Sequence, residues 1–123
     1  MALKDETKTF LSTLEGYHQL SKTLHWSAQS MSEHKLMDDI DHSILEYEDS
    51  IAEVVMGLTD SRFQNGDLKT LLPSAKDVKS MLRELKSDVS KYREKTDFSE
   101  GITNILDDFI TDIDKWNYLR TLS

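Results

Sequence analysis

The sequence predicts a single all-α domain over residues 1–123, an antiparallel four-helix bundle with a short helix in the connection between the second and third helices. Three observations support this fold class. Glycine occurs four times and proline once in 123 residues, too rarely for the many turns of a sheet protein. Charged residues make up 31% of the chain, as is typical of exposed helix surfaces. Apolar residues also recur at steps of three and four along four segments.

The first two segments predict long helices joined by a tight turn. The first extends from about Leu3 to Ala28, and its inward positions are Phe10, Leu11, Leu14, Tyr17, Ser21 and Leu24. A turn follows at Ser30, because Ser30 and Glu33 have the spacing of a capping box. The inward positions of the second helix are Met37, Ile40, Ile44, Tyr47, Ile51, Val54 and Leu58. This helix should end before the turn dipeptide Asn65-Gly66.

The remaining segments predict a linker and two further helices. Residues 67–72 contain three leucines, which favours one or two helical turns in the connection. Pro73-Ser74 then opens the third helix, with Ser74 as its N-cap and Asp77 three residues later. The inward positions of this helix are Val78, Met81, Leu82, Leu85, Val89 and Tyr92. Residues 96–99 break it, and the last helix carries Ile102, Leu106, Phe109, Ile113, Trp116 and Leu119.

Composition excludes several classes of function. The chain has no cysteine, so disulfides, thiolate zinc sites and cysteine nucleophiles are excluded, and any metal must be held by His and carboxylates. The formal net charge is -8, which argues against DNA binding by phosphate neutralisation. No apolar run approaches the ~18 residues that cross a membrane. No signal peptide is evident, so a cytoplasmic location is expected.

The second helix carries an unusual second face. At ~100° per residue, His34, Asp38, Asp49 and Glu53 fall within one arc away from the core positions. Leu45, Ala52 and Met56 share that arc. A face that mixes apolar residues with His and carboxylates is unusual for a solvated surface. We therefore expect it to contact another chain.

Distance decides how these residues can act together. His34 and Asp38 are one turn apart, as are Asp49 and Glu53, but ~22 Å of straight helix separates His34 from Asp49. An antiparallel copy of the helix, related by a two-fold axis near residues 41 and 42, would set the first pair of one chain against the second pair of the other. His25 joins them, because the hairpin brings it level with Asp38. His and carboxylate donors suit iron, manganese or zinc.

These residues resemble the Dps family, the mini-ferritins of the ferritin-like superfamily. His25-Trp26 is similar to that family's His-Trp pair, His34 to Asp38 to its His-x-x-x-Asp, and Asp49 to Glu53 to its Asp-x-x-x-Glu. The resemblance implies a ferroxidase centre of His25, His34 and Asp38 from one subunit with Asp49 and Glu53 from its mate. It implies iron oxidised by hydrogen peroxide or dioxygen, storage in a dodecameric shell, and protection against oxidative damage. The resemblance implies that Trp26 lies next to this centre, and the alternative is an ordinary helix-packing aromatic.

Other interpretations of the same residues remain open. The main alternative is a metal-free helical interaction or structural protein on the same bundle. A zinc or manganese binder would use the same ligands. A di-iron site within one chain needs two Glu-x-x-His motifs, whereas the chain offers only Asp39-Ile-Asp-His42. We interpret His18, two turns before His25, as structural.

Overall fold

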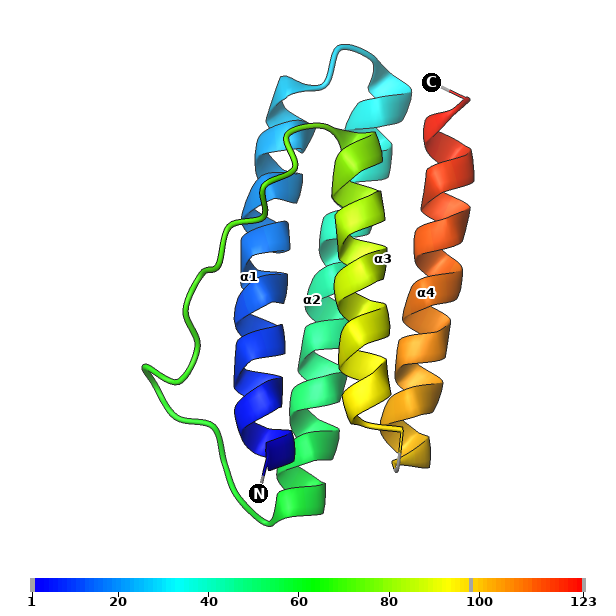
Figure 1. The fold of residues 1–123 in the computed structure, drawn as a ribbon. Helices are drawn as coiled ribbons and strands as arrows, with labels where there is room; N and C mark the ends of the chain where they lie inside the picture. The colour runs from blue at the N-terminus through cyan, green and yellow to red at the C-terminus, as the bar shows by residue number, and fades with distance from the viewer. Residues whose placement is uncertain (1, 98, 123) are drawn as a thin grey trace.

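The computed structural model describes residues 2–97 and 99–122, and all regular structure within them is helical (Figure 1). The four helices are α1 (Ala2–Ser27), α2 (Met31–Thr59), α3 (Val78–Lys95) and α4 (Glu100–Arg120). The predicted four-helix bundle is therefore confirmed. Phe98, inside the predicted break between the last two helices, lies outside the described residues.

The helices run up, down, down and up in chain order (Figure 1). α1 packs against α2 and α3, and α4 packs against the same two helices. Each adjacent pair is therefore antiparallel, while α2 and α3, which run in the same direction, lie on a diagonal. A bundle with one long crossover between its halves has the connectivity of ferritin-like folds.

The crossover, residues 60–77, is extended rather than helical, so the predicted short helix between the second and third helices is wrong. The backbone N–H groups that such a helix would use bond to α1 instead. Lys69 N–H donates to Ser12 Oγ at 2.9 Å, and Leu71 N–H donates to the Ser12 carbonyl at 3.1 Å. The segment must also return along α2, whose 29 residues span ~43 Å. An extended chain covers that distance easily.

The start of α3 differs from the prediction by one turn. Asp77, not Ser74, is the N-cap, and its carboxylate accepts a hydrogen bond of 2.8 Å from the Ser80 N–H. The Ser80 hydroxyl accepts in return from the Asp77 N–H, which completes a capping box. Ser74 is held outside the helix, because its N–H and hydroxyl both donate to the Glu84 carboxylate.

The core fills the centre of the bundle with large apolar side chains from all four helices. Fully buried members are Leu11, Leu14, Tyr17, Met37, Ile40, Ile44, Ile51, Met81, Leu85, Ile102 and Phe109. No helix among the described residues is long and apolar enough to cross a membrane.

Hydrogen-bonded polar pairs link three of the four packed helix pairs at the edges of this core. The Tyr17 hydroxyl donates to Asp88 at 2.6 Å between α1 and α3, and Tyr47 bonds to Asp112 between α2 and α4. Arg93 donates to Asp107 at 2.6 Å between α3 and α4. Because such bonds have fixed partners, they hold the helices in one register.

Candidate metal centre

His25 and His34 form a reciprocal pair where α1 turns into α2. His25 Nδ1 lies 2.8 Å from the His34 carbonyl oxygen, and His34 Nδ1 lies 3.0 Å from the His25 carbonyl oxygen. The two rings stack with their centroids 3.8 Å apart. A carbonyl oxygen only accepts, so each Nδ1 carries the proton and donates it. In the neutral rings this leaves the Nε2 lone pairs for a ligand, the tautomer in which a histidine commonly binds a metal.

The turn between the two helices fixes this pair. Ser30 is the N-cap of α2, and its hydroxyl accepts from the Glu33 N–H at 3.1 Å, as the sequence predicts. The Glu33 carboxylate accepts from the Gln29 N–H at 3.4 Å, one residue earlier than a full capping box requires. The turn is therefore closed from both sides, which sets His34 in the first turn of α2 opposite His25 in the last turn of α1.

Asp38 follows His34 by one turn of α2, and its side chain is 51% exposed. The His42 ring lies beside it, with Nδ1 3.5 Å from Asp38 Oδ1. A hydrogen bond to the Asp38 carbonyl and the negative charge of Asp38 raise the pKa of His42. The structure thus pairs His25 with His34, while the Asp38 carboxylate stands apart on the same helix.

Asp49 and Glu53 are exposed on α2, one turn from each other. They lie ~22 Å from His34 along the helix axis. Within residues 2–97 and 99–122, no three His, Asp or Glu side chains come close enough to hold a metal ion. Within one chain, the predicted site residues therefore lie in two separate groups along the hairpin.

Trp26, predicted next to the centre, is 72% exposed at the end of α1. Its ring packs against no core residue and instead carries the Lys22 ammonium 5.5 Å from its centroid. Trp26 therefore does not pack into the core that the described residues form. The large exposed ring is available to a partner molecule.

A groove of about 610 Å³ lies along α2, close to Asp49. Leu45, Ala52 and Met56 of α2 line it, as predicted for a second apolar face, and the crossover adds Phe63 and Leu68. Leu45 is 38% exposed. Exposed apolar surface of this kind on a charged helix is typical of a contact with another molecule.

Glu48, which the sequence analysis missed, also lines this groove beside Asp49. Burial is the main cause that raises the pKa of Glu48, and the neighbouring Glu15 adds to it. The carboxyl therefore retains its proton above the usual range of a glutamic acid. The position of Glu48 could have indicated that it belongs with the site residues, because it follows His34 by about four helical turns and lies on the same side of α2.

His18 supports the structural role expected for it. Its Nδ1 bonds to the Asp41 carboxylate, which joins α1 to α2 at the middle of the hairpin. Both side chains are mostly buried. All four histidines of the chain thus lie on the α1–α2 hairpin, two at its turn and two further along.

Residues 25–119 match the model of a family of unknown function, DUF5856. No curated protein and no solved structure matches the chain. The matched range contains both donor groups of α2, the crossover, α3 and most of α4. The chain belongs to the family of unknown function DUF5856.

Proposed function

We propose that this protein is a Dps-like ferroxidase that oxidises ferrous iron at a site shared between two copies of the chain. The observation that carries the proposal is the His25–His34 pair, because its two Nδ1–H···O=C bonds leave both Nε2 atoms free for a ligand. Two such nitrogens with the Asp38 carboxylate supply three donors from one copy. Asp49 and Glu53 of the other copy would complete the set.

A two-fold axis through α2 explains why one chain lacks a complete site. With the axis between residues 41 and 42, His34 of one copy lies level with Asp49 of the other, and Met31 lies level with Ala52. Met31 is 66% exposed, and Ala52 lines the apolar groove. The same axis therefore completes the donor sets and covers exposed apolar side chains, two requirements that are independent of each other.

The chemistry follows from the donors. Carboxylate oxygens stabilise the harder ferric ion more than the ferrous ion, so a mixed His and carboxylate set favours oxidation. Two ferrous ions each give up one electron. One hydrogen peroxide molecule takes up both electrons and two protons and becomes two water molecules. Dioxygen is the other oxidant we consider.

The remaining parts of the proposal concern assembly and location. Net charge -8 favours attraction of cations to the protein surface. We propose that two-fold dimers assemble further into a shell that stores the ferric product and limits oxidative damage. A cytoplasmic location is part of the proposal.

The test is aerobic and peroxide-driven oxidation of ferrous iron by the purified chain, followed by ferric absorbance. We expect His34→Ala to lower the rate by about tenfold or more, because it removes a ligand from every site. Glu94→Ala is the matched control, since Glu94 is an exposed carboxylate on α3, far from both donor groups in the fold. A wild-type rate no higher than that of the buffer would overturn the proposal and favour a metal-free interaction protein.

A further inference from the structure

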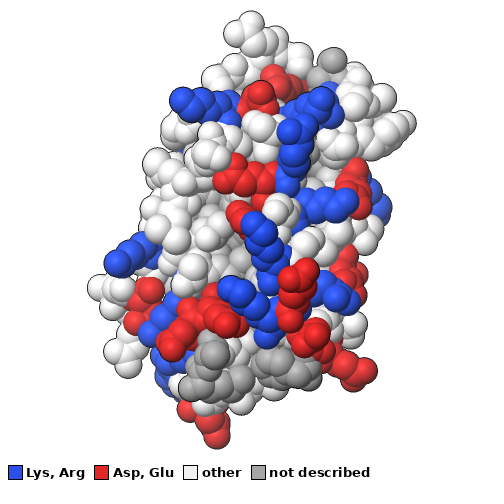
Figure 2. All heavy atoms as spheres, viewed as in Figure 1, with Lys and Arg blue, Asp and Glu red and all other residues white. Residues whose placement is uncertain are grey.

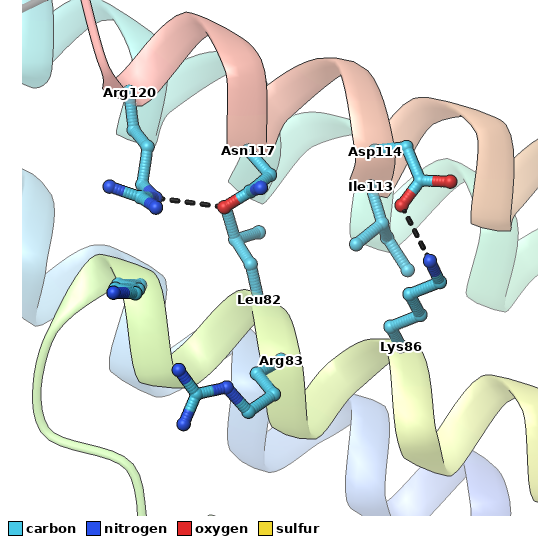
Figure 3. Close-up of a pocket in the computed structure, with 8 residues that line it drawn as sticks. Leu82, Arg83, Lys86, Ile113, Asp114, Asn117 and Arg120 are labelled. Atoms are coloured by element: carbon cyan, nitrogen blue, oxygen red, sulfur yellow. Dashed lines mark hydrogen bonds and ion pairs between the residues drawn. The ribbon is translucent and has the colours of Figure 1, made fainter.

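A second hollow, of about 210 Å³, lies between α3 and α4 on the other half of the bundle (Figure 3). Four cationic side chains line it, and Asp114 is its single carboxylate; the cations are Lys79, Arg83, Lys86 and Arg120. Leu82 and Ile113, both buried, form its apolar floor. The lining therefore has a net charge of +3, in a chain whose net charge is -8.

The ion pairs between α3 and α4 follow a regular register, and the positive charge of the hollow departs from it. Moving up the bundle, α3 and α4 are joined first by Arg93 and Asp107, then by Lys86 and Asp114 at 2.8 Å. Each step moves seven residues back on α3 and seven forward on α4. The next step would pair Lys79 with position 121, which is a threonine, and its neighbour on α4 is Arg120. Both Lys79 and Arg120 line the hollow, so a cation stands on each helix near the point where the register predicts a carboxylate.

Among the described residues, the cations at this end of the hollow lack close ion-pair partners. Across the part of the chain that the structure describes, neither Lys79 nor Arg83 forms an ion pair within 4.0 Å. The cap hydrogen bonds lower the pKa of Asp77 most, and the charges of Arg83 and Lys79 lower it further, but the Asp77 carboxylate is hydrogen-bonded as the N-cap of α3. Arg120 donates its Nε–H to the uncharged Asn117 side chain at 2.8 Å. This bond orients the guanidinium and leaves its terminal nitrogens for another partner.

Figures 2 and 3 show where the charged side chains of α3 and α4 lie. In Figure 3, Arg120 extends from α4 at the end of the hollow away from the Lys86–Asp114 pair, and Arg83 lies on α3 between them, with its guanidinium group drawn on the side of α3 away from α4. In Figure 2, Lys and Arg side chains gather along the face formed by α3 and α4, between patches of acidic residues. Like charges held near each other repel, so an anion between them would lower the electrostatic energy.

We propose that this hollow binds a small phosphate-bearing ligand. Guanidinium groups match the oxygens of a phosphate with two parallel hydrogen bonds, and the lining includes one arginine from each helix, Arg83 of α3 and Arg120 of α4. Lys79 adds a third positive charge. The ligand is small, because a long polyanion such as DNA would extend from this patch over an acidic surface. The source is either free phosphate or a phosphate monoester whose apolar group would contact the Leu82–Ile113 floor.

The experiment titrates the full, metal-free chain with inorganic phosphate and separately with phenyl phosphate at constant ionic strength, followed by amide NMR shifts. We expect saturable shifts over residues 79–86 and 113–120. Tighter binding of phenyl phosphate would identify a monoester as the ligand class, and tighter binding of inorganic phosphate would identify the free ion. Because no iron is present, this result is independent of ferroxidase activity.

Two variants and a control decide the assignment. Arg83→Gln and Arg120→Gln should each weaken binding about tenfold, since each removes charge-assisted hydrogen bonds. Arg62→Gln is the matched control, because Arg62 is exposed on the crossover, away from α3 and α4. Absence of saturable shifts with both probes would overturn the proposal. It would equally be overturned if correctly folded Arg83→Gln bound as tightly as the wild type.

Discussion

The carbonyl oxygen of Leu71 lies so close to Gly16 of α1 that a Cβ at position 16 would stand 1.8 Å from it. Only glycine lets the crossover pack this closely against α1 at this point. We therefore expect Gly16→Ala to push the crossover away and to lower the free energy of unfolding by about 1–3 kcal/mol, the usual cost of overpacking. Urea unfolding followed by circular dichroism measures this change.

Gly57 provides the control for this substitution. It lies in α2, and a Cβ there would meet no atom within 4 Å. Gly57→Ala should raise the free energy of unfolding by about 0.5–1 kcal/mol, because alanine loses less backbone entropy in a helix. Equal effects of the two substitutions would show that the contact between Gly16 and Leu71 is not formed.

Asp77, the N-cap of α3, predicts a pH-dependent effect. Hydrogen bonds from the Ser80 hydroxyl and N–H hold the pKa of Asp77 below its usual 3.8. A lowered folded-state pKa contributes stability above pH 3.8 that is lost as the pH falls through the lowered value. Asp77→Ala should therefore reduce the urea midpoint at neutral pH and have less effect in strong acid.

The substitution Ser74→Ala tests whether Asp77, rather than the predicted Ser74, is the N-cap of α3. The Ser74 side chain bonds to Glu84 outside α3, so its removal should leave the helix start and the pH dependence unchanged. If Ser74→Ala instead lowered the helix content more than Asp77→Ala, the observed cap would be contradicted.

The proposed dimer predicts a specific sensitivity on α2. Leu45→Arg places a charge in the apolar groove, and a buried unpaired charge is costly, so the dimer should dissociate at micromolar concentration. Leu58→Arg is the matched control, because Leu58 is 56% exposed on the same helix but outside the groove. Sedimentation velocity distinguishes the two outcomes. A Leu45→Arg variant that remains dimeric would remove α2 as the interface.

The sequence predicted the helices well because their amphipathic periodicity is strong. The inward positions of the third helix, Val78 to Tyr92, are all buried. The errors fall in last turns and in the connection. Leu58 and Leu119 fit the apolar pattern but are 56% and 44% exposed, since each lies in the last turn of its helix, where fewer neighbours remain. Amphipathic periodicity predicts which face of a helix is apolar, but it does not predict whether another helix extends far enough to cover that face.

The crossover and the His25–His34 contact could not be predicted from the local sequence pattern, because contacts between different segments of the chain determine both. Three leucines suggested a short helix over residues 67–72, but Ser12, more than fifty residues earlier, takes the N–H groups of Lys69 and Leu71. For the site, the sequence predicts candidate donors on one side of α2, and the structure places Asp49 and Glu53 on its exposed surface. The sequence did not predict that His25 would stack on His34, because the length of the turn and the two carbonyl bonds set that contact. Glu48 was missed because burial, not residue type, distinguishes it from the other carboxylates of α2.

The most direct test of the shared site mixes two inactive variants, His34→Ala and Glu53→Ala. In a mixed dimer, one site combines both defects, while the other keeps wild-type residues at both positions. With random pairing, half of the dimers are mixed and each regains one of two sites, so ferrous oxidation should recover to about a quarter of the wild-type rate. No recovery, with subunit exchange confirmed by mass spectrometry, would contradict the shared site even if the chain binds iron.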